Sequence, residues 1–218
     1  MAVAASERAG ADQPRRGVGR HAGAASAPSA EATVSWLESC TWTEEAYFAL
    51  PDTNHLLELS DGRLVVLEMP TIEHQDLAFE AAHRLRLWTT QSRAGKVVVA
   101  PYPIRLWPGK IREPDVVFYR TEHLDRIHAQ YGEPPDVALE VLSPSTRSTD
   151  LRRKSLEYAR AGVAEYWVID PHARWVELYA LEGRRYRRVG RFVPGDVARS
   201  TVLEGFTLDV AELFAALT

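Results

Sequence analysis

The sequence is poor in the residues that hold small proteins together by covalent or metal bonds. Its 218 residues include a single cysteine, Cys40, which excludes an internal disulfide. No group of Cys and His residues has the spacing of a zinc site. Stability must therefore come from a packed core, which a chain with 45% hydrophobic residues can supply.

Long apolar runs are also missing. No run approaches the roughly 18 to 20 apolar residues that a membrane-spanning helix needs. The first residues lack the apolar stretch of a secretory signal. The sequence therefore predicts a cytoplasmic protein with no membrane association.

Positive charge is carried almost entirely by arginine, and the acids slightly outnumber the bases. The formal net charge of −4 argues against coating nucleic acid by bulk electrostatics, although it allows a local basic groove. Only Lys96, Lys110 and Lys154 among the 26 basic residues are lysines. Because a lysine is a compact ammonium with a tunable pKa, a lysine at a special position points to chemistry that arginine cannot perform.

The composition changes along the chain. Residues 1–33 are rich in Ala, Gly, Ser and Arg, with almost no large apolar residues and no periodicity. This composition predicts a disordered tail. Residues 34–218 are expected to form a single α/β domain.

Local patterns predict helices and strands in an order that suits a mixed sheet flanked by helices. Thr43 is a plausible N-cap for a short helix that ends at Leu50, and Asp61-Gly62 favours a tight hairpin turn. Leu77, Ala81, Leu85 and Trp88 recur at helical spacing. The predicted helices are 43–50, 71–92, 148–161 (ending at Gly162) and 210–217, and the predicted strands are 96–106, 112–120, 135–143, 165–171 and 174–181.

Two acids interrupt strands that are otherwise apolar. Asp115 follows Pro114 at the start of one, and Glu140 lies among Val and Leu in another. Each buried carboxylate would be costly without a partner. On neighbouring strands the pair would suit Mg²⁺, which commonly binds one or two carboxylates, water and substrate phosphate. Alternatively, each acid caps a turn or pairs with an arginine.

The predicted helix 148–161 places Lys154 on its inward face. At about 100° per residue, Lys154 falls with Leu151, Tyr158 and Ala159, whereas Arg152, Arg153, Glu157 and Arg160 point elsewhere. A buried ammonium needs a partner, which Asp115 and Glu140 would supply. Together they could bind a metal and stabilise the charge of phosphodiester cleavage. The alternative is a lysine that extends past the core to water.

The stretches EPDVVFY and PPDVALEVLSPSTRSTDLRRKSLEYARAGVAEYWVIDP resemble the Uma-type family of bacterial "putative restriction endonucleases", once labelled a domain of unknown function. That family belongs to the PD-(D/E)XK nuclease superfamily. The resemblance extends from about Thr41 to Leu208. It implies a restriction-endonuclease-like core, a mixed central sheet flanked by helices.

The resemblance also implies roles for individual residues. Asp115 would be the PD aspartate and Glu140 the second metal ligand, whereas Leu142 occupies the position of the superfamily's usual lysine. A lysine carried on the following helix matches Lys154. Glu58 matches the family's hairpin motif; Glu73, Glu80 and His74 are further candidates near the metal or a phosphate.

Two functions of different class follow. The first is a Mg²⁺-dependent (or Mn²⁺-dependent) DNA endonuclease, for which a homodimer would supply the two sites that double-strand cleavage needs. The second is a catalytically inactive nucleic-acid-binding or interaction protein with the same fold. Hydrolysis of another phosphodiester is a third. Arg147, Arg152 and Arg153 lie near the candidate site and are expected to contact phosphates.

Overall fold

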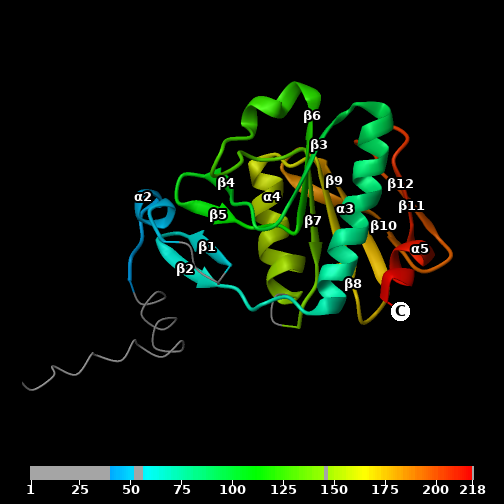
Figure 1. The fold of residues 1–218 in the computed structure, drawn as a ribbon, viewed down its shortest axis with the longest axis horizontal. Coiled ribbons are helices and arrows are strands. Elements are labelled where there is room, and N and C mark those ends of the chain that lie inside the picture. Colours follow the sequence, from blue (N-terminus) through cyan, green and yellow to red (C-terminus); the bar gives the residue numbers. More distant parts are fainter. Residues whose placement is uncertain (1–39, 52–55, 145–146, 218) are drawn as a thin grey trace, which may run out of the picture.

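The computed structural model describes residues 40–51, 56–144 and 147–217 (Figure 1). The predicted tail, residues 1–33, lies outside the described residues. In the part of the chain that is described, no helix is long and apolar enough to span a bilayer.

A six-stranded mixed sheet forms the centre of the molecule. Its strands are β3 (Gly95–Val99), β6 (Val116–Arg120), β7 (Val137–Val141), β8 (Glu165–Asp170), β9 (Trp175–Glu182) and β10 (Arg185–Phe192). They lie in the order β10-β9-β8-β7-β6-β3. Only the β7–β8 pair is parallel, because the chain crosses over between these two strands through a helix. The predicted mixed α/β architecture is therefore confirmed.

Helices cover both faces of this sheet (Figure 1). Helix α3 (Ile72–Ser92) packs Leu77 and Leu85 into one core with the β6 and β7 side chains Phe118 and Val137. Helix α4 (Ser155–Ala161) packs Tyr158 into a second core on the opposite face. Because side chains alternate across a strand, neighbouring residues of β6 and β7 contribute to different cores.

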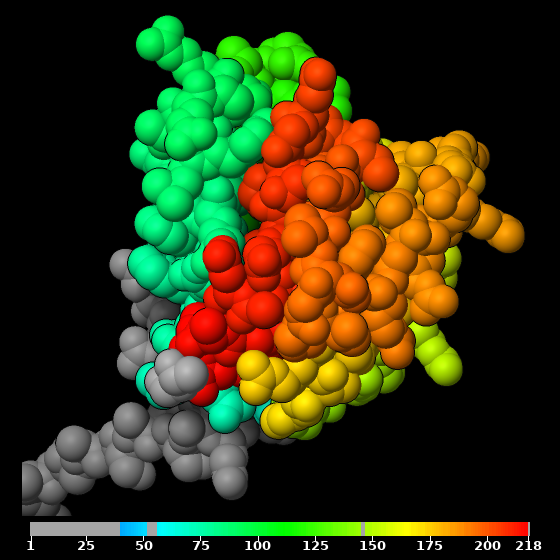
Figure 2. Space-filling view, turned by 90° about the vertical axis from the view of Figure 1, so that its right-hand side faces the viewer, coloured from blue at the N-terminus to red at the C-terminus, as the bar shows by residue number. Residues whose placement is uncertain are grey.

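The C-terminal elements complete the α3 face. They are β11 (Val197–Arg199), β12 (Thr207–Asp209), α5 (Val210–Phe214) and the 3₁₀ turn Ala215–Leu217. Figure 2 shows this segment lying against α3 and filling the space beside β10. The predicted final helix is confirmed, and Asp209 caps it by accepting from the Glu212 amide.

A second, smaller sheet lies beside the α4 face. Its strands are β1 (Leu57–Ser60), β2 (Arg63–Val66), β4 (Ile104–Trp107) and β5 (Lys110–Arg112), in the order β2-β1-β5-β4. The predicted hairpin turn is confirmed: Asp61 and Gly62 both have positive φ, 54° and 80°. Helix α2 (Glu44–Phe48), capped by Thr43 as predicted, packs against this sheet through Tyr47.

Two predicted strands are in fact divided between the two sheets. The predicted strand 96–106 splits into β3 and β4, and the predicted strand 112–120 splits into β5 and β6. Prolines lie at both breaks, at positions 101, 103 and 114, and proline cannot donate to a strand ladder. After β6 the chain makes a 3₁₀ turn, Thr121–Arg126, before β7. Asp115 consequently lies where the chain passes from the small sheet to the large one.

The predicted helix 148–161 is present, but its first turns are π-helical. Residues Thr149–Lys154 form the π-helix, α4 follows directly, and Gly162 ends it with φ 83°. Lys154 is buried as predicted. It is not the only inward charge, however, because Asp150 is also buried and the Glu157 side chain is only 11% exposed. The count at 100° per residue placed Glu157 elsewhere and left out Asp150, although four residues at that angle put Asp150 only about 40° from Lys154.

Candidate active site

Asp115 lies between the two sheets and contacts the end of β7. Its Oδ2 accepts a hydrogen bond from the backbone N–H of Val141 at 2.7 Å, and its side chain is 16% exposed. The sequence analysis left open whether this acid caps a turn or belongs to a site. It does cap the β7 backbone, and the same bond places it beside the residue after Glu140.

Glu140 is nearly enclosed, because it points from β7 toward the face of the sheet that α4 covers. Its Oε1 accepts from Nζ of Lys154 at 2.9 Å and from the Tyr158 hydroxyl at 2.7 Å. Both donors come from the π-helix and α4. The structure therefore brings Glu140 and Lys154 together, and the alternative of a lysine that extends to water is wrong.

Lys154 is surrounded by carboxylates. Besides Glu140, its Nζ lies 3.2 Å from Oδ1 of Asp150 and 3.4 Å from Oε1 of Glu58. Burial disfavours the charged form, but these three acids outweigh it and raise the pKa of Lys154 well above its usual value. Lys154 is a permanent cation at neutral pH.

Lys154, Glu140, Asp150 and Glu58 form a buried cluster that contains more acid than base. Burial, and then the charges of Asp150 and Asp115, raise the pKa of Glu140 well above its usual range even though Lys154 opposes the shift. Glu58 differs: Lys154 and Arg112 more than offset its burial and lower its pKa. The three acids around the single Lys154 ammonium thus leave the cluster with surplus negative charge, which disfavours ionisation of Glu140.

A divalent cation would offset this surplus of negative charge. Asp115 and Glu140 offer hard oxygen ligands, the type that Mg²⁺ prefers. Among the described residues, no group of three or more His, Cys, Asp or Glu side chains has the arrangement of a metal site. Two carboxylates can suffice for Mg²⁺, because water and phosphate oxygens commonly complete its shell.

The further candidates fall into two groups. Glu58 contacts Lys154, and Nε2 of His74 lies 3.3 Å from Oδ2 of Asp115. Nδ1 of His74 is buried and has no hydrogen-bond partner within the described ranges. By contrast, Glu73 is exposed on the first turn of α3, and Glu80 pairs with Arg84. Neither contacts the cluster.

The three candidate arginines have different surroundings. Arg147 is paired with the buried Asp170 and lies over the ring of Trp175. Arg152 and Arg153 are exposed. Arg153 also lines a pocket of about 210 Å³ whose walls include Glu58 and Lys154.

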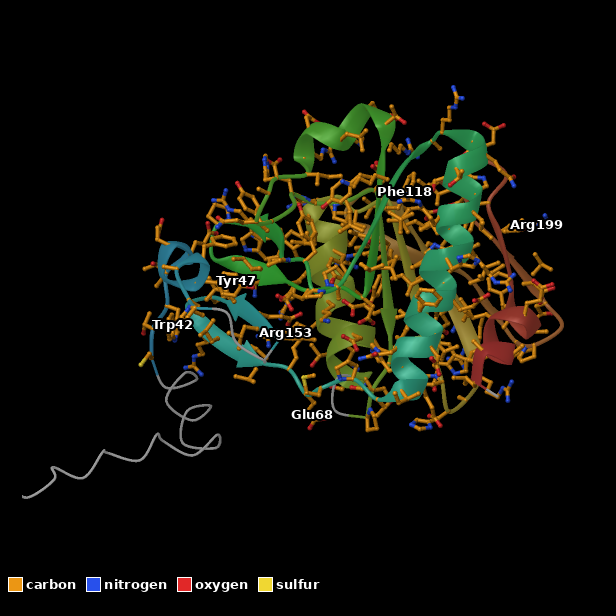
Figure 3. The ribbon with its side chains drawn as sticks, in the orientation of Figure 1. Trp42, Tyr47, Glu68, Phe118, Arg153 and Arg199 are labelled. Carbon is orange, nitrogen blue, oxygen red and sulfur yellow. The ribbon has the colours of Figure 1, made fainter. Side chains whose placement is uncertain are left out.

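Figure 3 labels two of the residues around this pocket, Arg153 and Glu68. They come from the π-helix and from the segment after β2, respectively. The pocket therefore opens between the small sheet and the helix that carries Lys154. Glu58 and Lys154 of the cluster form part of its wall.

Several charged residues of the site were not expected. Asp150 lies four residues before Lys154, the spacing at which helical side chains meet, so a signal for it was present. Glu113 precedes Pro114-Asp115; burial and the nearby Glu58 raise its pKa to about 7. Arg112 gave no local signal, since its partners come from distant parts of the chain.

Comparisons with known proteins identify the family and a solved structure with the same fold. The model of the Uma2 family, described as "Putative restriction endonuclease", matches residues 44–211. A solved structure from Anabaena variabilis ATCC 29413, described as "a putative nuclease belonging to DUF820", superposes with a TM-score of 0.69 and 19% identity. The match covers 81% of this chain and 99% of that one, and at this identity it shows a shared fold. No curated protein matches the sequence. Because the family match runs over more than half of its length, the chain belongs to the Uma2 family of "putative restriction endonucleases".

Proposed function

We propose that this protein is a Mg²⁺-dependent endonuclease that hydrolyses phosphodiester bonds of DNA. The observation that carries the proposal is the 2.9 Å contact between Nζ of Lys154 and Oε1 of Glu140, buried in a cluster with surplus negative charge and adjacent to Asp115. An ammonium beside metal-binding carboxylates is the combination that phosphodiester hydrolysis requires.

Each residue has a separate task in this scheme. Asp115 and Glu140 hold Mg²⁺, and Mn²⁺ would substitute for it. The ion would polarise the phosphate and favour ionisation of the attacking water. Lys154 donates hydrogen bonds to that water or to the charged phosphate oxygens in the transition state, and it can do so because its pKa keeps it protonated. Glu58 is a counter-charge for Lys154.

His74 supports Asp115 in this scheme. Asp115 raises the pKa of the imidazole above its usual value despite the opposing effect of burial. A protonated His74 would share a proton with Oδ2 of Asp115 and keep the carboxylate oriented toward the site.

The surface around the pocket would contact the DNA backbone. Arg153 lines it and the neighbouring Arg152 is also exposed, so both would be open to phosphates, whereas Arg147 is already engaged by Asp170. A homodimer would supply the second site for double-strand cleavage. These contacts carry no base-specific information, so they serve positioning rather than sequence recognition.

A second candidate function is nucleic-acid binding without hydrolysis. One observation favours it: Oε1 of Glu140 already accepts from both Lys154 and Tyr158, so a metal would compete with two donors for that oxygen. In this case the acidic cluster would be a structural ion network.

Incubation of supercoiled plasmid with the purified protein and Mg²⁺ or Mn²⁺ separates the two functions. Asp115→Ala, Glu140→Ala and Lys154→Ala are tested in parallel. The endonuclease requires metal-dependent nicking that all three variants lose. Equal nicking by every variant indicates a contaminant and removes the assigned site. DNA binding without nicking by the wild type supports the second function.

Glu177→Gln is a suitable control for these variants. Glu177 is likewise a buried strand glutamate, but it pairs with Arg188 and Arg191 on β10 and has no contact with the Lys154 cluster. Nicking by this variant should equal that of the wild type, which would show that loss of a buried glutamate alone does not abolish activity.

A further inference from the structure

A buried ionic bridge connects the small sheet to the helix that carries Lys154. Arg112, on β5 and 1% exposed, donates from Nε and Nη2 to the two oxygens of Glu157 at 2.7 and 2.9 Å. Its Nη1 donates to Oε2 of Glu58. Glu157 lies three residues after Lys154, so one guanidinium joins two acids on opposite sides of the cluster.

Lys110 strengthens the same bridge from the neighbouring position on β5. Its Nζ donates to Oε1 of Glu157 at 3.1 Å and to Oγ of Ser60 and Oδ2 of Asp61 at 2.7 Å each. The Lys110 side chain is 2% exposed. Two of the three lysines in the chain are therefore buried in this region.

The bridge gives the two carboxylate oxygens of Glu58 different partners. Oε2 of Glu58 faces Arg112, and Oε1 faces Lys154 at 3.4 Å, which is longer than the 2.9 Å between Lys154 and Glu140. With Arg112 present, Glu58 is neutralised without drawing Lys154 away from Glu140. Without Arg112, Glu58 would be a buried anion with Lys154 as its nearest cation, and the ammonium would be drawn toward it.

We propose that Arg112, held in place by Glu157, is a positioning residue that fixes Glu58 and thereby keeps the Lys154 ammonium against Glu140. Glu157 and Arg112 are not members of the catalytic set; they act on Lys154 through these neighbours, although Arg112 also lines the pocket. The role rests on the proposed function, because it concerns the same site. A lysine could not replace Arg112, since only the planar guanidinium fork can bond two carboxylates at fixed angles.

Arg84 is a matched control for Arg112. It also joins two carboxylates, Glu80 and Glu212, but it does so on the surface between α3 and α5 and makes no contact with the cluster. Replacing each arginine by glutamine removes a comparable bridge. A change seen with Arg112→Gln and absent with Arg84→Gln therefore reports on the site.

The position of Lys154 can be followed by NMR, independently of any nuclease activity. The chain has three lysines, so protein labelled with ¹⁵N-lysine gives at most three side-chain ammonium signals by NMR, and Lys154→Met assigns the one from Lys154. We expect Arg112→Gln and Glu157→Gln to shift or broaden the Lys154 signal, and Arg84→Gln to leave it unchanged. An unchanged Lys154 signal in a folded Glu157→Gln protein would overturn the proposal, and this variant serves even if Arg112→Gln fails to fold.

Plasmid nicking then shows whether the position matters for cleavage. We expect Arg112→Gln and Glu157→Gln each to lower kcat at least tenfold with little change in KM, and the double variant to lose little more than either single variant, since the two residues act as one unit. Equal kcat for wild type and Glu157→Gln would contradict a positioning role. Absence of nicking by the wild type would refute the proposed function alone, because the NMR result still decides whether Arg112 and Glu157 position Lys154.

Discussion

Nζ of Lys154 donates to Oε1 of Glu140 across 2.9 Å, although the two residues belong to different elements, a π-helix and the central strand β7. Each side chain is almost fully buried, and the Lys154 ammonium depends on Glu140, Glu58 and Asp150 together for its counter-charge. The contact joins the helix to the sheet at the point where Asp115 caps β7. Its removal has separate consequences for stability and for cleavage.

Replacement of Lys154 by methionine should destabilise the protein and abolish nicking. The methionine keeps the length of the side chain but leaves Glu140, Glu58 and Asp150 without their shared cation. We expect the free energy of unfolding to fall by about 3 to 5 kcal/mol at pH 8. The loss should be smaller at pH 5, where the carboxyl groups can take up protons. Urea denaturation measures the loss in free energy of unfolding at each of the two pH values. An equal loss at pH 5 and pH 8 would show that the ammonium does not balance these acids.

Glu140→Gln should separate activity from stability. The pKa of Glu140 is raised by burial and neighbouring acids, so its ionised form is unfavourable in the folded protein. A neutral amide removes that cost while keeping the shape. We expect a melting temperature equal to or above that of the wild type in EDTA, with nicking reduced at least 100-fold.

Glu177→Gln is the control for this substitution, and we expect it to change the melting temperature in the opposite direction. Burial opposes ionisation of Glu177, but Tyr179, Arg188 and Arg191 outweigh it and lower its pKa, so the charged form stabilises the fold. The amide should therefore lower the melting temperature at pH 7 and leave nicking intact. A lower melting temperature for Glu140→Gln than for Glu177→Gln would contradict the surplus of acid in the cluster.

Much of this framework could be predicted because its signals are local. The cap at Thr43, the Asp61-Gly62 turn and the glycine stop at Gly162 each depend on a few adjacent residues, and all three are confirmed. The burial of Lys154 was also predictable, since helical spacing and the scarcity of lysine pointed to the same residue.

The division of the chain between two sheets was not predictable in the same way. The predicted strand 112–120 joins the end of β5 to β6, although these two strands pair with different partners, β1 and β3. Strand pairing joins residues far apart in sequence, and so does the bridge from Glu58 through Arg112 to Glu157. A single sequence carries no local trace of such contacts. The metal ligands and the DNA contacts stay predictions.

Glu113 should make stability depend on pH in the absence of metal. Burial and the charge of Glu58 raise its pKa from 4.5 to about 7, so folding favours its protonated form. The resulting stabilisation is complete below about pH 4.5 and is lost as pH rises through 7. At pH 8 the free energy of unfolding is therefore lower than it is below pH 4.5, by roughly 3 kcal/mol at most. Glu113→Gln should remove this part of the pH dependence between pH 5 and 8, as measured by urea denaturation in EDTA; an unchanged slope would place the titration elsewhere.

Arg152 and Arg153 should contribute to DNA affinity through salt-dependent phosphate contacts. Both are exposed; Arg153 lines the pocket and lies 3.7 Å from Glu157, whereas Arg147 is tied to the fully buried Asp170. Replacing either by alanine should weaken binding to all DNA sequences alike and reduce the slope of log K against log salt by about 1. Arg184→Ala, in the exposed turn between β9 and β10, is the control and should leave the slope unchanged. Binding is measured by fluorescence anisotropy in EDTA from low to moderate salt, so that cleavage cannot interfere. If Arg184→Ala lowers the slope as much as Arg153→Ala does, the DNA lies along the β9–β10 hairpin instead of the pocket beside Lys154.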